Sequence, residues 1–327
     1  MKKSRFLCIV MCICLLGLMG CTRNPNPISK SGIYFDTVIT VTVYRADDSK
    51  ILDECFAMAE KYENLFSKTV ESSDIYKINH SGGTPTTVND ETIYLVQKAL
   101  DYAAMTDGAI DPTILPLSDL WNFGENETVP DNEAIASKLT SVGYESVLVD
   151  AATNTVTLLD ANAGIDLGFI AKGYIADKMK ELLLANRVEH ALINLGGNIL
   201  CVGNKPDGSL FTLGVKEPFS QTNSQVAIVE VQDKSLVSSG VYERYFYEND
   251  MLYHHILDTS TGYPVDNGLW GVTILSDSSM EGDAYSTICM CLGLDKALAM
   301  IEETEGIEAL FITEDMELVY SSGFPKN

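Results

Sequence analysis

Hydrophobic and polar residues alternate over residues 34–44, where β-branched residues dominate, and this pattern predicts a strand. Further along, apolar residues recur every three or four positions, as on the buried stripe of a helix. Five segments have this spacing, the last with a break at Gly293: 51–66, 91–106, 131–142, 171–185 and 280–300. The pattern therefore predicts amphipathic helices separated by segments of a different character.

The segments between these helices are predicted to be largely strands. A buried strand over 164–168 leads almost directly into the helix that begins near residue 171. The other expected strands are β-branched or alternating and lie within 146–159, 191–203, 210–215, 225–232, 241–250 and 309–324. Helices and strands are mixed without strict alternation, so the expected class is α+β, with mixed helices and antiparallel-rich sheets, rather than doubly wound.

Residues 1–20 have the character of a lipoprotein signal peptide. A positively charged start is followed by an apolar run over 6–19 that is too short to span a membrane comfortably. The run ends in Leu-Met-Gly-Cys, which resembles a bacterial lipobox and would make Cys21 the lipidated first residue of the mature chain. The alternative is an ordinary signal peptide that happens to contain cysteine. We expect 21–31 to be a lipidated, flexible tether and 32–327 to be the folded domain.

The balance of charge limits the partners that the chain can have. Its 22 basic and 46 acidic residues give a formal net charge of −24, which argues against nucleic acid and against a polybasic membrane surface. Attachment to a membrane would depend on the lipid. An anionic ligand would need a local positive field, for example from a metal ion. The cysteines beyond Cys21 lie in apolar runs without zinc-like spacing, so we expect buried thiols.

Four segments carry polar residues that packing alone does not require. In the first, 108–121, Asp111 suits the N-cap of a short helix. In the second, 165–177, Lys172 stands where a buried strand is predicted to turn into a helix. A solvated lysine on the first helical turn is the simpler interpretation of the local sequence. The alternative is a lysine that binds a phosphate beside helix N–H groups.

The other two segments carry candidates for proton transfer and metal binding. Two of the four histidines lie in 254–265, where a histidine could accept a proton from a hydroxyl or could simply occupy a hairpin turn. In 282–287, Asp283 and Thr287 are four residues apart and share one face of a helix. Hard oxygen ligands at this spacing suit magnesium. An N-cap role for Asp283 is the simpler alternative.

Together these segments resemble a known family. Eight stretches occur in one order: FDT (35–37), FSKTVESSDIYKIN (66–79), GAIDPTILPL (108–117), DLGFIAKGY (166–174), LINLGGN (192–198), SSGVYERYF (238–246), HHILDTSTGYPV (254–265) and GDAYST (282–287). With them the chain resembles the ApbE family of FAD:protein FMN transferases over about residues 33–320. The resemblance implies that family's architecture, which is α+β and related to the T-fold.

The resemblance also implies an activity and a set of site residues. FMN would be transferred from FAD to a Thr or Ser hydroxyl of a target protein through a phosphoester bond, with magnesium as cofactor and release of AMP. The implied FAD-binding residues are Phe35, Thr69, Ala109, Ile110, Asp111, Asp166, Lys172, His255 and Ile256. The implied metal ligands are the Phe169 carbonyl, Asp283 and Thr287, with Ser286 adjacent. Either His255 or Asp283 could be the general base, and we favour His255 because metal binding lowers the basicity of a carboxylate.

Three positions depart from the usual family pattern. Phe169 replaces a glycine that often follows Asp-Leu-Gly, which a carbonyl ligand would tolerate. Thr69 replaces a tyrosine, so one aromatic contact to the flavin nucleotide would be missing. Phe35 takes the place of a methionine.

Two other activities remain consistent with these residues. A flavin-binding lipoprotein would hold FAD without transfer, and a magnesium-dependent FAD pyrophosphatase would cut the same bond with water to give FMN and AMP. For the transferase, the resemblance implies a membrane or extracytoplasmic redox protein as acceptor, with a Ser/Thr-Gly-Ala-Ser/Thr motif. We expect a protein anchored by lipid to the cell membrane and facing its extracytoplasmic side.

Overall fold

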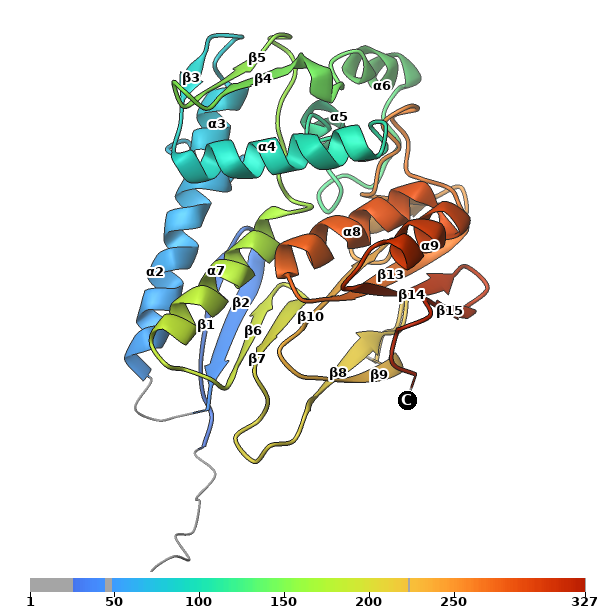
Figure 1. Cartoon of the computed structure of the whole chain (residues 1–327). Coiled ribbons are helices and arrows are strands. Elements are labelled where there is room, and N and C mark those ends of the chain that lie inside the picture. The colour runs from blue at the N-terminus through green and yellow to red at the C-terminus, as the bar shows by residue number, and fades with distance from the viewer. Residues whose placement is uncertain (1–25, 45–48, 223, 327) are drawn as a thin grey trace, which may run out of the picture.

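A single large antiparallel sheet organises the protein, in a computed structural model that describes residues 26–44, 49–222 and 224–326 (Figure 1). The expected signal peptide 1–20 and Cys21 lie outside these residues. Eight strands form the sheet in the order β1-β2-β6-β7-β10-β13-β14-β15, and every neighbouring pair is antiparallel. Their bounds are β1 Ile28–Tyr34, β2 Thr37–Val43, β6 Ala191–Leu195, β7 Asn198–Val202, β10 Ser235–Gly240, β13 Leu269–Ser276, β14 Ile307–Thr313 and β15 Leu318–Tyr320.

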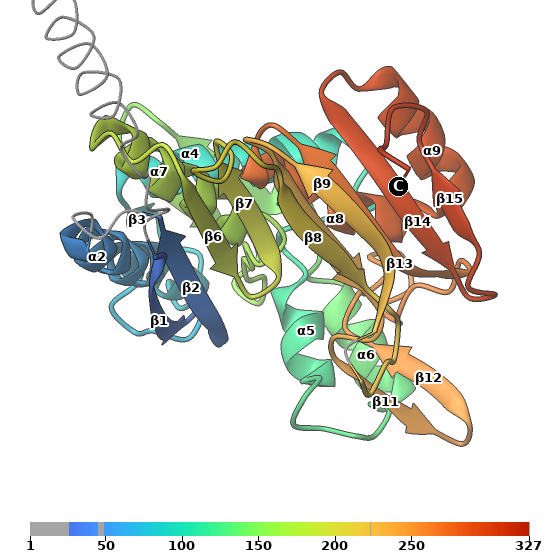
Figure 2. The ribbon, with the colours of Figure 1, turned by 90° about the horizontal axis from the view of Figure 1, so that it is seen from below.

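Helices cover one face of this sheet (Figures 1 and 2). Helix α2 (Ser49–Phe66) packs on β1 and β2, α7 (Ala171–Ala185) on β6 and β7, and α8 (Ser279–Leu292) on β10 and β13. Helix α9 (Leu294–Glu303) packs on β14. Part of the other face is covered by the hairpin of β8 (Phe211–Lys216) and β9 (Gln225–Val231), whose buried side chains form a core with those of the sheet. The main core therefore lies between the sheet and its helices.

The remaining elements lie above and beside these layers. Helix α4 (Asp90–Met105) crosses over the end of α2, below a three-stranded sheet (Figure 1). A second group surrounds the buried Trp121, with the hairpin of β11 and β12 beside α5 and α6. The bounds are α3 Asp74–Asn79, β3 Thr86–Thr87, α5 Leu115–Trp121, α6 Asn132–Leu139, the 3-10 turn Tyr144–Ser146, β4 Val147–Asp150, β5 Thr155–Leu158, β11 Tyr245–Glu248 and β12 Met251–His254.

The close approach of α7 and α8 depends on a glycine. A Cβ atom on Gly173 would lie 2.2 Å from the backbone oxygen of Ser279 and 2.6 Å from the Cα atom of Met280. Any side chain at this position would push the helices apart. Asp177, one turn further along α7, accepts hydrogen bonds from the backbone N–H groups of Ser279 and Met280, at 2.8 and 3.0 Å. The sequence of α7 thus fixes where α8 begins.

Several predictions about the elements are confirmed, and others need correction. Helix α7 has the expected bounds, and Gly293 separates α8 from α9. The strand expected over 34–44 is present as β2, but it is the second strand of a hairpin that turns at Phe35 and Asp36, which have φ angles of 52° and 55°. Its first strand begins at Ile28, so the end of the expected tether is part of the sheet.

The prediction of a strand over 164–168 is wrong. Only one isolated bridge, between Gly164 and Ile114, is formed there. The next residue, Ile165, bonds through both its N–H and its carbonyl to the side-chain amide of Asn79, at 2.7 and 2.9 Å. A side chain thus takes the place of a neighbouring strand. Within the described ranges, no helix combines the length and apolar character needed to cross a bilayer.

Candidate functional site at the start of helix α7

Lys172 is neither free in solvent nor far from other charges. Its ammonium group donates to the backbone oxygen of Gly168 at 2.8 Å and lies 3.6 Å from Oδ1 of Asp283. The side chain is 29% exposed. The interpretation of Lys172 as a solvated lysine is therefore wrong, because the side chain folds back over the loop toward a carboxylate on α8. The positive charge lies at the surface, within reach of a ligand.

Asp283 joins α7 to α8. It lies inside α8 with 4% exposure, and its Oδ2 accepts the backbone N–H of Gly173 at 2.9 Å. The N-cap interpretation of Asp283 is wrong, since the cap of α8 is Ser278. One carboxylate oxygen is thus held by the start of α7, and the other faces Lys172.

Hydroxyl groups lie on the same face of α8 as Asp283. The Ser286 hydroxyl donates to the carbonyl oxygen of Asp283 at 2.9 Å. The Ser239 hydroxyl, on β10, lies 2.8 Å from that of Ser286 and 3.2 Å from that of Thr287. The three predicted residues of α8 therefore lie on one helix face, as their spacing indicated. Ser239 was not predicted, although it lies in one of the motif segments.

The donors at this place fit magnesium better than a softer metal. Among the described residues, no three His, Cys, Asp or Glu side chains come together as a metal-binding group. A metal here would depend on the Asp283 carboxylate and on neutral oxygens, namely the Thr287 hydroxyl and the Phe169 carbonyl. Oxygen ligands with one carboxylate suit Mg²⁺, which keeps several waters and binds substrate phosphates.

Asp166 forms a second ion pair at the junction. Its Oδ2 lies 3.0 Å from the ammonium group of Lys68, and its Oδ1 accepts the N–H of Gly168 at 2.8 Å. Burial alone would raise the pKa of Asp166, but Lys68 and this hydrogen bond outweigh it, so that the pKa is lowered and the group is ionised at neutral pH. Lys68 was not singled out by the sequence analysis, although it follows the first two residues of a motif segment.

The loop between α4 and α5 contains Ala109, Ile110 and Asp111. Asp111 is 4% exposed, and its carboxylate accepts both the N–H and the hydroxyl of Thr113, at 2.8 and 2.7 Å, and the N–H of Tyr144 at 2.8 Å. Burial raises its pKa despite these hydrogen bonds. Asp111 thus shapes the loop, but the residue before α5 is Ile114, so the N-cap interpretation is wrong.

His255 directly follows β12 and is fixed by Arg244. Its backbone N–H and its ring Nδ1 both lie near the Arg244 carbonyl oxygen, at 3.1 and 3.3 Å. Since a carbonyl only accepts hydrogen bonds, we assign the ring proton to Nδ1, which leaves Nε2 as the basic nitrogen. Burial, together with the positive charges of Arg244 and Lys172, lowers the pKa of His255 to about 3. The imidazole is therefore neutral at pH 7.

Hydrogen bonds tie the separate motif segments together. Asp166 donates its backbone N–H to the Pro112 carbonyl at 2.7 Å, and the Thr259 hydroxyl donates to the Gly108 carbonyl at 2.6 Å. The loop before α5 is thereby joined both to the start of α7 and to the segment that contains His255 and the buried Ile256.

Phe35 and Thr69 lie near the end of α2. The N–H of Phe35 donates to the Glu63 carboxylate at 2.8 Å, while the exposed Thr69 follows Lys68, the partner of Asp166. Phe35 is only half-buried, at the turn of the β1–β2 hairpin.

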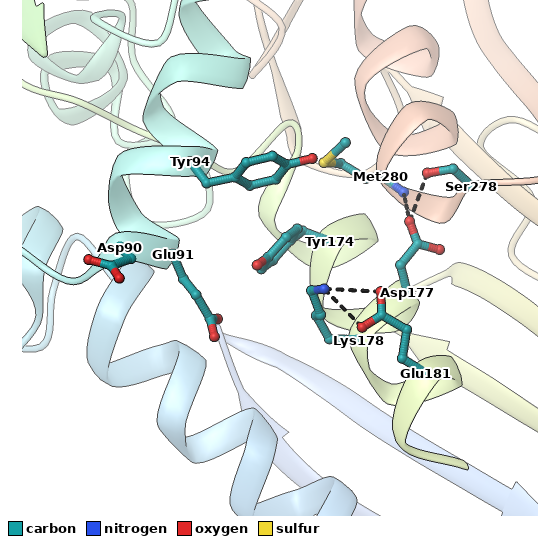
Figure 3. Close-up of a pocket in the computed structure, with 9 residues that line it drawn as sticks. All are labelled: Asp90, Glu91, Tyr94, Tyr174, Asp177, Lys178, Glu181, Ser278 and Met280. Carbon is teal, nitrogen blue, oxygen red and sulfur yellow. Dashed lines mark hydrogen bonds and ion pairs between the residues drawn. The ribbon is translucent and has the colours of Figure 1, made fainter. Parts of the chain in front are cut away.

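A separate cavity of about 350 Å³ lies further along α7, between α4 and the start of α8 (Figure 3). It contains none of the predicted site residues. Carboxylates and two tyrosine rings line it together with Lys178, Ser278 and Met280: Asp90, Glu91, Asp177, Glu181, Tyr94 and Tyr174. We place the site at the junction and not in this cavity, because the junction brings predicted site residues such as Lys172 and Asp283 together.

Known proteins resemble the chain along most of its length. The model of the ApbE family matches residues 35–311. The FAD:protein FMN transferase of Klebsiella pneumoniae (strain 342) is 35% identical over 296 residues, which cover 90% of this chain and 92% of that protein. The protein of the same name from Treponema pallidum (strain Nichols) is 32% identical over 335 residues, covering 96% and 92%.

Solved structures agree with these relatives. The crystal structure of the ApbE protein from Thermotoga maritima has a TM-score of 0.83 and 31% identity, and the match covers 90% of this chain and 97% of that one. Flavin transferase ApbE from Vibrio cholerae has a TM-score of 0.81 and 27% identity, with 91% and 98% covered. The predicted α+β class is thus confirmed. From the ordered motifs, the fold that joins them and these matches, we conclude that the chain belongs to the ApbE family.

Proposed function

We propose that this protein transfers FMN from FAD to a Thr or Ser hydroxyl of a target protein and releases AMP. The curated relatives named above are FAD:protein FMN transferases. The observation that carries the proposal is the contact between α7 and α8, where Lys172, the Gly173 N–H and the Asp283 carboxylate meet. Phosphoryl transfer depends on positioning and on neutralising the charge of the phosphates, which Lys172 and a metal ion held by Asp283 would supply.

We further propose magnesium as the cofactor, held by Asp283, Thr287 and the Phe169 carbonyl, with Ser286 orienting the backbone beside them. When bound, the ion would neutralise charge on the pyrophosphate and on the leaving AMP. The hydroxyl network around Ser239 would keep Thr287 oriented. Lys172, 3.6 Å from Asp283, would bind a phosphate oxygen beside the ion.

The first-turn N–H groups of α7 are poorer phosphate ligands than the sequence suggested. The Ala171 N–H bonds to the Leu167 carbonyl at 2.9 Å, and the Gly173 N–H bonds to Asp283. Two donors of the first turn are thereby used inside the protein. In the proposed reaction, side chains such as Lys172 therefore supply most of the binding to phosphate.

His255 is the general base in this proposal. Its ring is neutral, with Nε2 free of the Arg244 contact, so it can take the proton from the incoming hydroxyl. The acceptor oxygen forms a bond to the FMN phosphorus, and the bond between that phosphorus and the oxygen bridging to AMP breaks. The low pKa makes His255 a weak base, so its contribution depends on positioning the acceptor hydroxyl.

The test uses the full chain in detergent with FAD, Mg²⁺ and a protein carrying an Asp-x-x-Thr-Gly-Ala-Thr segment. We expect flavin fluorescence that stays with the acceptor on a denaturing gel, and its loss with Asp283→Ala. FAD binding without a covalent product would instead favour a flavin-binding lipoprotein. Free FMN and AMP in equal amounts would indicate a pyrophosphatase.

We also propose attachment to the outer side of the cytoplasmic membrane through a lipid on Cys21. The sheet begins at Ile28, so only six residues separate it from Cys21, and a fully extended chain of this length spans about 20 Å. Such a tether would keep the domain close to membrane-bound acceptors. Labelling with radioactive palmitate tests this proposal, since label should be incorporated by the wild type and not by Cys21→Ser.

A further inference from the structure

Arg244 differs from the other basic residues at the junction in having no acidic partner. Lys68 is paired with Asp166 at 3.0 Å, and Lys172 lies 3.6 Å from Asp283. Within the part of the chain that the structure describes, no carboxylate lies within 4.0 Å of the Arg244 guanidinium. The chain carries a net charge of −24, and the guanidinium group of the exposed Arg244 nevertheless stays open to an anion from outside the chain.

The backbone places Arg244 directly beside His255. Its carbonyl oxygen is 3.1 Å from the backbone nitrogen and 3.3 Å from the ring Nδ1 of His255. The residue stands in the turn between β10 and β11, and the neighbouring Glu243 pairs with Lys216 at 3.6 Å instead. The positive charge of Arg244 acts on two predicted site residues, since it lowers the pKa of both His255 and Asp166.

An anion is the ligand that such a residue would bind. The guanidinium group presents parallel N–H donors that match two oxygens of one phosphate, and it stays charged at all relevant pH values. Two N–H groups at the start of α7 are already bonded, so the substrate needs cations from side chains. We propose that Arg244 binds the pyrophosphate of the FAD substrate through its guanidinium group and holds it next to His255.

This inference rests on the proposed function and adds one residue to the binding of its substrate. It assigns two roles to one position. The carbonyl of Arg244 orients the imidazole, and this role survives any side-chain substitution. The guanidinium binds the phosphates, and this role is lost on substitution. The two can therefore be separated by experiment.

The test compares Arg244→Gln and Arg244→Lys with the control Arg187→Gln. Arg187 is the other arginine among the described residues, and it is exposed just after the end of α7. Affinities for FAD and for riboflavin, which has no phosphate, are measured by fluorescence titration of the full chain in detergent. Losing a charged hydrogen bond costs about tenfold or more in affinity. We expect Arg244→Gln to weaken FAD binding by at least that factor, Arg244→Lys by less, and Arg187→Gln not at all.

The ratio of the two affinities distinguishes phosphate binding from a structural role. Riboflavin affinity should be the same in all four proteins if Arg244 contacts only phosphate. Equal loss for FAD and riboflavin, or unchanged FAD affinity in Arg244→Gln, would overturn the inference. If the wild type transfers FMN normally while Arg244→Gln binds FAD equally well, only this inference fails. If the wild type binds no FAD, the proposed function fails with it.

Discussion

The two ends of α7 have different surroundings although they belong to one helix. At its start, Lys172 and Gly173 contact Asp283, which is more than 100 residues away in the sequence. Further along, the cavity of Figure 3 is lined by residues of the same helix, where Lys178 pairs with Glu181 at 2.9 Å and Asp177 accepts backbone N–H groups at the start of α8. The start of α7 thus carries the predicted site residues, while its later part supports the helix that packs on it.

The largest expected effect comes from Asp283→Asn. The amide keeps the shape of the side chain and an oxygen that can accept the Gly173 N–H, but it removes the negative charge. We expect turnover to fall by a factor of about 100 or more, as for loss of a charge-stabilising group in other enzymes, with little change in melting temperature. Steady-state formation of flavinylated acceptor measures the first quantity, and thermal unfolding measures the second.

Asp177→Asn is the matched control from the other region. Asp177 accepts N–H groups at the start of α8, so its loss should reduce the free energy of unfolding by about 1 kcal/mol. Turnover at saturating FAD should stay near that of the wild type. If Asp177→Asn loses turnover and Asp283→Asn loses only stability, the start of α7 is not the catalytic end of the helix.

Gly173→Ala should reduce stability, and turnover with it, because Gly173 lies where α7 meets α8 at the site. The new Cβ atom would lie 2.2 Å from the Ser279 backbone oxygen, so α7 and α8 must separate. Overpacking of this kind costs about 1–3 kcal/mol in the free energy of unfolding. Chemical denaturation measures it. Gly282→Ala is the control, because its Cβ would first meet the Ser276 hydroxyl, at 2.7 Å, rather than backbone. A larger loss in the control would mean that the approach of the two helices is not the constraint.

Acid should destabilise the protein through its buried histidines. Burial lowers the pKa of His254 to about 4, from an ordinary value of 6.5. Between these two pH values the unfolded state binds the proton and the folded state does not, so the free energy of unfolding falls as the pH falls. The slope is at most about 1.4 kcal/mol per pH unit for each such histidine.

His254→Gln tests this acid sensitivity. His255 contributes in the same window, since its pKa is lowered as well. The variant should therefore have a flatter dependence of unfolding free energy on pH between about 6.5 and 4, although not a flat one. An unchanged slope would show that His254 titrates normally in the folded protein.

Glu181→Gln should have the smallest effect. The side chain of Glu181 is 64% exposed in its pair with Lys178, and such surface pairs contribute at most about 1 kcal/mol. We expect both turnover and melting temperature to match those of the wild type. A marked loss of flavin transfer in this variant would mean that the cavity takes part in the reaction.

Local sequence patterns predicted the helices and one face of the site. The stripe of α7 and the spacing of Asp283 and Thr287 are local properties, and both were predicted correctly. The failures involve distant partners. Ile165 is hydrogen-bonded to Asn79, 86 residues away, whereas the apolar residues around it in the sequence predict a strand. The local sequence alone favours a solvated Lys172, because no local rule places Asp283 next to it.

Counting products in a single reaction tests the central claim most directly. The full chain in detergent, FAD, Mg²⁺ and the acceptor protein are incubated together, and AMP, free FMN and flavin bound to the acceptor are measured over time. We expect one AMP for each flavin attached, with little free FMN, and neither product with Asp283→Asn. Release of AMP and free FMN in equal amounts, without flavin on the acceptor, would contradict it.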